Sequence, residues 1–551
     1  MINNIKTKER VKNTLSFDNI IDKLILWSVI ISLLIFILYP IIMVISTSFY
    51  SKGLFTLSNY KNLINPKNLK LIKNSIFVVT LSSFIGVIIS TSIALFAFMG
   101  KWKSKIYKGM LLAMISPPFV SSIALITLFG RRGLITYNLL GLSVNPYGWK
   151  GIVLLQSLGK IPLGVIMLVA AINAIDQRHI LASRDLGATS FETLKNILIP
   201  GIFPTILAVL FLNFTMNLAD FGTPIIIGGK FKMLATETYM TIFSSGDLGK
   251  AAAMSVLLIP PAIIAFTFYK KNMDNINNKS EGSKALGSSN YKFDVPVALK
   301  YLTGFITISF FGITILKYGT IFLTAISMNA SGKLIFTLDH IKKVKVSNLP
   351  AVMRSIYFAI VAGVVSSVIG ILLSYYTHRR KIWGMKYIEF ISALPYIIPG
   401  TFFGLGYIVA FKDEPFLLTG TTAIVILNIT FRHISVANKA TNAAFTTIDT
   451  RIEDSSRDLG ASHFRTIRTI IFPMLKPVFL TSFIDTFSAA MTTVGAIIFL
   501  VSPRNVIASI VMFKDITNGG YGEASVMASI LILITVSVNL IAIRLLNKGD
   551  I

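Results

Sequence analysis

The sequence contains no cysteine among its 551 residues. This absence excludes disulfide bonds, thiolate metal sites and cysteine nucleophiles, and it removes any clue to the redox compartment. The fold must therefore be held together by packing and hydrogen bonds alone.

Acidic residues are also scarce, with 24 Asp and Glu against 52 Lys and Arg, which gives a formal net charge of +28. In a soluble protein this balance would suggest nucleic acid as a partner. Here 54% of the residues are hydrophobic and only 14% are charged, and most basic residues lie in short segments between apolar runs. Anionic lipid and the positive-inside rule explain such segments, so we expect a lipid bilayer and no nucleic acid as the partner.

The sequence lacks a phosphate-binding loop. Gly249-Lys250 resembles the end of a P-loop, but Ser244 occupies the position of its first glycine and Ala251 that of its Ser or Thr. The five histidines are scattered, and no zinc-ligand cluster or nucleophile elbow occurs. We therefore expect a chain that is not an enzyme and itself binds no cofactor, and the sequence leaves a metal site unknown.

Long apolar runs are abundant, and many reach the roughly 20 residues that cross a bilayer about 30 Å thick. They predict an all-α integral membrane protein with about twelve transmembrane helices. The expected spans lie near 24–49, 74–99, 109–130, 151–174, 201–222, 250–269, 301–327, 354–377, 387–411, 421–444, 474–500 and 524–545.

A polar stretch at 270–300, rich in Asn, Ser, Gly and Lys, is expected to be a cytoplasmic linker. It separates a first half, 1–269, from a second half, 301–551, each with six spans. The basic residues before the first span favour a cytoplasmic N-terminus, so an even number of spans returns the C-terminus to the same side. Several lysines also fall in the expected outer segments, which weakens the charge bias. Six spans per half make the halves parallel repeats about an axis along the membrane normal.

One polar segment occurs twice, at an offset of 273 positions. Arg184-Asp185-Leu186-Gly187-Ala188 recurs as Arg457-Asp458-Leu459-Gly460-Ala461, and the prolines that follow, Pro200 and Pro473, keep the same offset. The segments lie in loops at about 175–200 and 448–473. A helix end with a glycine C-cap, used twice because the gene duplicated, is the alternative explanation. Other landmarks also pair at offsets of 280 and 278: Asn74-Ser75-Ile76 with Arg354-Ser355-Ile356, and Pro117 with Pro395.

The repeated segment resembles the EAA loop of the permease subunits of binding-protein-dependent ABC importers. That loop forms a coupling helix, which docks into a groove on the ATPase subunit. The signature Glu-Ala-Ala itself is changed, to Leu181-Ala182-Ser183 in the first copy and Asp454-Ser455-Ser456 in the second. By this resemblance the residues that couple to the ATPase are Arg184, Asp185, Leu186, Gly187, Ala188, Pro200, Asp454, Arg457, Asp458, Leu459, Gly460, Ala461 and Pro473.

The resemblance extends over nearly the whole chain after the first span. Stretches such as 116–136, 218–224 and 490–502 look like fused permeases of the ferric-iron importer group. This implies a type I ABC importer permease in a bacterial inner (cytoplasmic) membrane, with two copies of a separate ATPase and an extracytoplasmic substrate-binding protein as partners. Ferric iron is the expected substrate, moved by alternating access. Relatives that move phosphorylated sugars, phosphonates or thiamine keep those substrates open.

Polar residues within the fifth span of each half are candidates for the pathway, because an intramembrane charge is costly unless it faces water or a partner. They are Asn213, Asn217, Asp220, Asp485 and Thr493. Asp220 could instead reach lipid headgroups from the outer end of its span, and Asp485 could pair with a neighbouring lysine or hydroxyl. If these acids carry protons, the chain would be an ion-coupled secondary transporter, which is the competing class of function.

Prolines and a glycine interrupt the third span of each half, at Pro117, Pro118, Pro395, Pro399 and Gly400. Broken helices are tolerated where the backbone is buried in protein or lines a cavity. Pro117 and Pro395 could therefore shape the pathway or a gate, or simply kink a packed helix. Arg131, Arg132 and Arg504 in outer segments could engage acidic residues of a binding protein, or anchor at headgroups.

Overall fold

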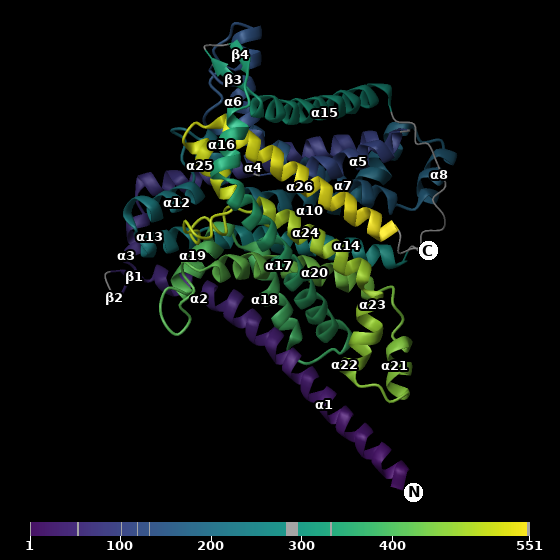
Figure 1. Cartoon of the computed structure of the whole chain (residues 1–551). Coiled ribbons are helices and arrows are strands. Elements are labelled where there is room, and N and C mark those ends of the chain that lie inside the picture. The colour runs from purple at the N-terminus through teal and green to yellow at the C-terminus, as the bar shows by residue number, and fades with distance from the viewer. Residues whose placement is uncertain are drawn as a thin grey trace. The chain divides into compact units, whose positions relative to one another are not determined.

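The computed structural model describes residues 2–51, 54–100, 102–117, 119–131, 133–282, 296–330 and 333–547. Regular structure in these residues is helical except for two antiparallel hairpins (Figure 1). One pairs β1 (Tyr50–Ser51) with β2 (Leu54–Phe55), and the other pairs β3 (Ser327–Ala330) with β4 (Lys333–Phe336). The prediction of an all-helical membrane fold is confirmed.

The chain divides into two compact units. Unit 1 comprises Met1–Ser46, Pro350–Ala508 and Leu533–Ile551. Its helices are α1 (Ile2–Leu33), η1 (Leu34–Leu38), most of α2 (Tyr39–Ser48), α17 (Leu349–Ser374), η4 (Tyr375–Arg379), α18 (Met385–Ile397), α19 (Gly400–Ala410), α20 (Thr422–Phe445), α21 (Arg451–Asp458), α22 (His463–Thr466), η5 (Ile467–Ile471), α23 (Phe472–Met474), α24 (Lys476–Thr492) and the second part of α26 (Tyr521–Asn547). The η elements are short π-helical turns that continue their neighbouring helices.

Unit 2 comprises Thr47–Leu349 and Ser509–Ile532, and it contains both hairpins. Its helices are α3 (Ser58–Leu63), α4 (Pro66–Met99), α5 (Lys103–Met114), α6 (Val120–Phe129), η2 (Leu134–Leu139), α7 (Trp149–Asn173), α8 (Gln177–Asp185), α9 (Ser190–Thr193), η3 (Leu194–Leu198), α10 (Ile199–Leu218), α11 (Gly222–Ile227), α12 (Leu234–Ser245), α13 (Leu248–Val256), α14 (Ile259–Gly282), α15 (Val297–Ala325), α16 (Asp339–Ser347), most of α25 (Ala508–Thr517) and the start of α26.

Eight stretches of the described helices are long and apolar enough to cross a bilayer, or ten if two bent helix pairs each count as one span. Two of the twelve expected spans are missing from this set. The span at 109–130 is divided into the short helices α5 and α6, and the span at 421–444 is the continuous helix α20, which carries Arg432 and His433 in its middle. The count of twelve therefore stays a prediction.

The units do not coincide with the two sequence halves, because each takes in the first span of the other half. In unit 1, α1 runs along α18 toward α22 (Figure 1). The Asp22 carboxylate of α1 accepts a hydrogen bond from the hydroxyl of Tyr376 at 3.1 Å and forms an ion pair with Arg380. In unit 2, α15 packs on α4 and α6, and the Tyr318 hydroxyl donates to the Ile115 carbonyl at 2.9 Å.

Paired landmarks of the two halves make equivalent hydrogen bonds. The Ser75 hydroxyl of α4 accepts a hydrogen bond from the Leu234 amide at 2.8 Å, and the Ser355 hydroxyl of α17 accepts one from the Ala508 amide at the same distance. The preceding side chains, Asn74 and Arg354, each donate to a backbone carbonyl two residues before that amide, at 3.0 and 2.8 Å. The duplication read from the sequence is therefore also visible in tertiary contacts.

Serines and glycines on α4 and α17 let neighbouring helices approach closely. A Cβ on Gly164 would lie 2.7 Å from the Ser90 hydroxyl, and one on Gly370 would lie 2.4 Å from the Ala437 Cβ. Small residues of this kind are typical of helix contacts in membranes, where close backbone approach replaces the hydrophobic driving force.

The expected linker, 270–300, lies partly outside the described residues. Helix α14 continues to Gly282 and α15 begins at Val297, so its two ends are helical. The residues between 283 and 295 are not described.

Candidate functional site: two repeated helix–turn–helix segments

The first copy of the repeated segment is a short helix closed by a left-handed turn. Helix α8 ends at Asp185, and Gly187 follows with a φ of +84°. The Gly187 amide donates to the Arg184 carbonyl at 2.9 Å, and the Ala188 amide donates to the Ser183 carbonyl at 3.1 Å. These two bonds form a Schellman motif, in which glycine takes up a backbone conformation that other residues adopt only with strain.

The second copy repeats this geometry. Helix α21 ends at Asp458, and Gly460 also has a φ of +84°. Its amide donates to the Arg457 carbonyl at 2.8 Å, while the Ala461 amide donates to the Ser456 carbonyl at 3.1 Å. The glycine C-cap considered for the repeated segment is therefore present in both copies, and a coupling role for these residues stays a prediction.

A hydroxyl pair ties each turn to the helix that follows it. Ser183 and Thr193 lie 3.0 Å apart through their side-chain oxygens, and Ser456 and Thr466 do the same. Such matched side-chain bonds hold the two short helices of each copy in one arrangement. The turn therefore has a rigid support on both sides.

The residue just before each glycine is a leucine that projects into solvent. Leu186 is 88% exposed and Leu459 is 90% exposed. Both repeats therefore hold a large apolar side chain in solvent at the same point of the turn. Arg184, Asp185, Asp454, Arg457 and Asp458 are exposed around the leucines.

The two copies differ in their charges. Glu192 in the first copy completes a capping box with Thr189, whose amide and hydroxyl donate to the Glu192 carboxylate at 2.7 and 2.8 Å. Arg465 stands at the equivalent position of the second copy, where Ser462 is the N-cap and donates its hydroxyl to Asp18 of α1 at 2.6 Å. The second segment is therefore also anchored to the exchanged first span.

The start of α21 carries a largely buried ion pair that the first copy lacks. The Glu453 carboxylate lies 3.3 Å from the Arg379 side chain, whereas the equivalent Ile180 is buried and apolar. Burial raises the pKa of Glu453, and Arg379 opposes that shift. Asp454, which stands at the position of the signature Glu, is exposed.

The prolines enter the following span differently in the two copies. Pro200 lies at the start of α10, in a continuous apolar helix over Ser190–Leu218. Pro473 lies in α23, and the equivalent helix is bent by 72° between His463–Met474 and Lys476–Thr492.

The family model described as binding-protein-dependent transport system inner membrane component matches residues 82–272 and again 366–548. The chain belongs to this family. Because the family domain occurs twice, the protein is a fused permease with both transmembrane halves in one polypeptide and a type I permease fold. Its relatives are permease subunits of transporters and not enzymes. Family membership decides against the ion-coupled secondary transporter.

Curated relatives cover most of the fused permease. The ferric transport system permease protein FbpB of Actinobacillus pleuropneumoniae is 30% identical over 93% of this chain and 76% of the relative. FbpB 1 of Haemophilus influenzae is 29% identical over 87% of this chain and 78% of its own length. The spermidine/putrescine transport system permease protein PotB of the same organism is 24% identical over 44% of this chain.

Two candidate pathway residues of the first half are buried among helices of unit 2. Asn217 of α10 donates its side-chain amide to the hydroxyls of Ser82 and Ser83 at 3.2 and 3.3 Å. Asn213 is 1% exposed, and its amide atoms have no hydrogen-bond partner within the described residues.

The two candidate acids have different surroundings. Asp220 lies after the end of α10, where its carboxylate accepts hydrogen bonds from the Thr223 amide at 3.1 Å and from the Gln156 side chain at 3.3 Å. Asp485 lies exposed on α24 and has neither a hydrogen bond nor an ion pair in the described part of the chain. Thr493 ends α24 in an extended conformation. Their part in a pathway stays a prediction.

The third span of each half is broken at the expected prolines. Pro117 is buried in the segment between α5 and α6, while Pro118 is outside the described residues. Pro395 is buried near the end of α18, and α18 and α19 meet at 114°.

Sequence reasoning missed a buried polar pair on α20. Asn428 is fully buried and its two amide atoms have no partner among the described residues, and Nη1 of Arg432, one turn later, is likewise buried and unpaired there. The guanidinium lies against Gly400, where an added Cβ would be 2.1 Å from Nη1. The sequence pattern that could have revealed this pair is the spacing of Asn428 and Arg432, which are four residues apart within the expected span 421–444. The described residues contain no group of three or more His, Asp or Glu that could hold a metal ion.

Proposed function

We propose that this chain is the translocating permease of an ATP-driven importer of ferric iron. The substrate is supported by FbpB of A. pleuropneumoniae, which is named a ferric transport system permease and aligns with nearly the whole chain. We place the permease in a bacterial inner membrane with both termini in the cytoplasm.

The observation that carries the proposal is the pair of matching glycine turns, each with an exposed leucine. Two ATPase subunits would dock on these turns, one on Leu186 and one on Leu459, and would bind ATP and Mg²⁺ themselves. An extracytoplasmic binding protein would deliver iron to the outer side.

Transport then follows alternating access. Closure of the ATPase dimer on ATP would draw the two turns together, and each turn is connected to the span after it through the α9–η3–α10 or α22–η5–α23–α24 path. Such coupling needs only two states of the permease that ATP and substrate bias differently.

Uptake of radiolabelled ferric iron by iron-limited cells tests both parts of the proposal. Cells that lack the chain should regain uptake when the native gene is restored, but not with Gly187→Trp/Gly460→Trp. Gly420→Trp is the matched control, because Gly420 has a φ of +82° and, like both turn glycines, open space where a side chain would begin.

Tryptophan therefore strains the backbone similarly at Gly187, Gly460 and Gly420. Only the first two positions lie on the proposed docking surface. Full uptake by the double variant, with normal membrane insertion, would show that the turns do not couple. No iron uptake with the native chain, while the ATPase still co-purifies with it, would overturn the substrate only.

A further inference from the structure

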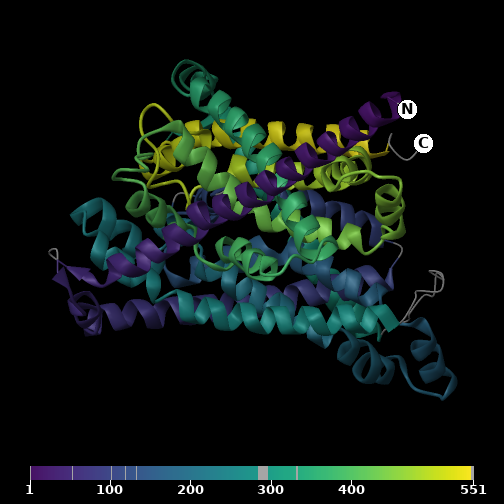
Figure 2. The same ribbon diagram turned by 90° about the horizontal axis from the view of Figure 1, so that it is seen from below.

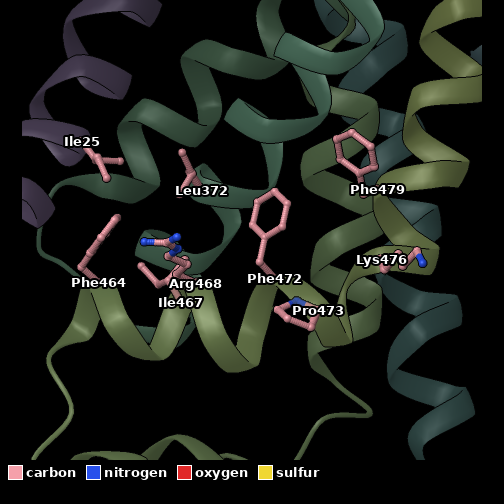
Figure 3. Close-up of a pocket in the computed structure, with 9 residues that line it drawn as sticks. All are labelled: Ile25, Leu372, Phe464, Ile467, Arg468, Phe472, Pro473, Lys476 and Phe479. Atoms are coloured by element: carbon pink, nitrogen blue, oxygen red, sulfur yellow. The ribbon is translucent and has the colours of Figure 1, made fainter.

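Unit 1 contains an apolar cavity of about 390 Å³ beside the second turn. Its walls come from α1, α17 and the path from α22 to α24, including Ile25, Leu372, Phe464, Phe472 and Phe479 (Figure 3). The rings of Phe472 and Phe479 form one side, with their centroids 6.2 Å apart. An apolar lining of this kind suits a hydrocarbon chain.

The cavity lies at the bend between α23 and α24. Pro473 and Lys476 flank that bend and both line the cavity. The equivalent helix of unit 2 runs without such a bend through Pro200 and Phe203, the residues that correspond to Pro473 and Lys476. Figure 2 shows the purple helix α1, which contributes Ile25 to the cavity, crossing the green helices of unit 1. The bend therefore distinguishes the second copy from the first.

Two basic side chains line the same cavity. Figure 3 shows the Arg468 guanidinium between Phe464 and Phe472, and Lys476 beyond Phe472. Both residues are exposed, and neither forms an ion pair or a hydrogen bond through its side chain within the described residues. A cavity with hydrocarbon walls and two uncompensated positive charges is complementary to an amphiphile with an anionic head.

The position of the cavity favours a membrane lipid as that amphiphile. It lies where the polar segment around α22 gives way to the apolar helix α24, and the neighbouring side chains Leu24 and Trp27 on α1 are 64% and 58% exposed. Tryptophan is enriched at the level of lipid headgroups, and basic pockets between membrane helices bind anionic headgroups.

We propose that this cavity binds an anionic phospholipid, with an acyl chain between Phe472 and Leu372, the phosphate beside Arg468, and Lys476 as a second positive charge at the opposite rim of the cavity. The bound lipid would brace the bend that joins the second turn to its span. The proposed transport cycle does not involve this lipid site, and the binding test below requires no transport activity.

Native mass spectrometry of the detergent-purified full chain, with added phosphatidylglycerol or phosphatidylcholine of the same acyl chains, measures the binding. We expect the native chain to bind phosphatidylglycerol more tightly. Arg468→Gln and Lys476→Gln should each reduce that preference about fivefold, the effect of one basic residue near anionic lipid.

The first copy supplies the matched control, because Lys195 stands where the second copy has Arg468 and is also exposed. Lys195→Gln should leave the preference unchanged, and Leu372→Trp, which fills the cavity, should reduce binding of both lipids. Equal binding of the two lipids by the native chain would overturn the proposal. An equal loss with Lys195→Gln and Arg468→Gln would also overturn it, because the attraction would then be nonspecific.

Discussion

Leu186 and Leu459 are held in solvent by backbone geometry, since each precedes a glycine with a φ of +84° that closes its helix. Neither side chain packs on its own unit, so truncating it costs the fold little. Leu186→Asp/Leu459→Asp should therefore abolish co-purification of the ATPase while the melting temperature of the permease stays within error. Val346→Asp is the control, because Val346 is 86% exposed on α16 and outside both turns. Loss of the ATPase with this control, or its retention with the double variant, would contradict the docking surface.

Asp515 should make stability depend on pH. It lies on α25, outside the candidate spans, and its pKa is raised to about 6, first by burial and then by the negative charge of Glu523. The native side chain thus keeps its proton at a pH where the unfolded chain has lost it, and stability falls as pH rises from about 4 through 6. Asp515→Asn should raise the free energy of unfolding by about 1 kcal/mol at pH 7.5, after allowance for partial exposure, and leave it unchanged at pH 4.

Melting of the purified protein by scanning fluorimetry at the two pH values measures this difference. Asp413→Asn is the control, because its side chain is 79% exposed. An equal gain for Asp515→Asn at both pH values would show that ionisation is not the cause.

The structural role of some single residues could be predicted from the sequence, and that of others could not. Gly187 and Gly460 could be predicted, because a glycine after a short polar helix implies a left-handed turn. Asp22 could not, because its ion pair with Arg380 joins positions 358 apart and no local pattern encodes that contact. Arg432 was overlooked among apolar neighbours although its charge was visible.

Among the elements, the broken span α18–α19 approaches the backbone of another segment closely at a glycine. A Cβ on Gly404 would lie 2.5 Å from the carbonyl oxygen of Ala496, a backbone atom that cannot rotate away. Gly404→Ala should therefore lower the free energy of unfolding by about 1–3 kcal/mol. Gly312→Ala is the control, because Gly312 lies in helix α15 with open space around it and should gain about 0.5–1 kcal/mol. Both changes can be measured as shifts in melting temperature, and a neutral Gly404→Ala would refute the close approach.

Apolar length predicted most spans well, because each backbone group in a bilayer must be paired within its own helix. The span expected at 421–444 forms the continuous helix α20, although Arg432 makes it too polar for the set of candidate spans. Apolar length could not give the angle of a break. Pro117 and Pro395 marked the breaks, but the 114° between α18 and α19 depends on tertiary packing.

For the whole molecule, the exchange of first spans means that neither sequence half contains a complete unit. If the chain is divided between Gly282 and Pro296, each fragment should be unstable alone, because α1 and α15 would be separated from the helices that cover them. Co-expression of the two fragments should restore a complex that co-purifies and carries out uptake. A stable, monodisperse second-half fragment without α1 would contradict this account. Sequence predicted the duplication but not the exchange, because the offset of a repeat says nothing about which helices pack together.

We propose that this fused permease moves ferric iron when an ATPase acts on its two turns. The most direct measurement is accumulation of radiolabelled ferric iron in proteoliposomes that contain the purified chain, its ATPase and its binding protein. We predict accumulation that requires ATP and is lost with Gly187→Trp/Gly460→Trp but not with Gly420→Trp. Accumulation that proceeds equally without ATP, or with the double variant, would contradict the account.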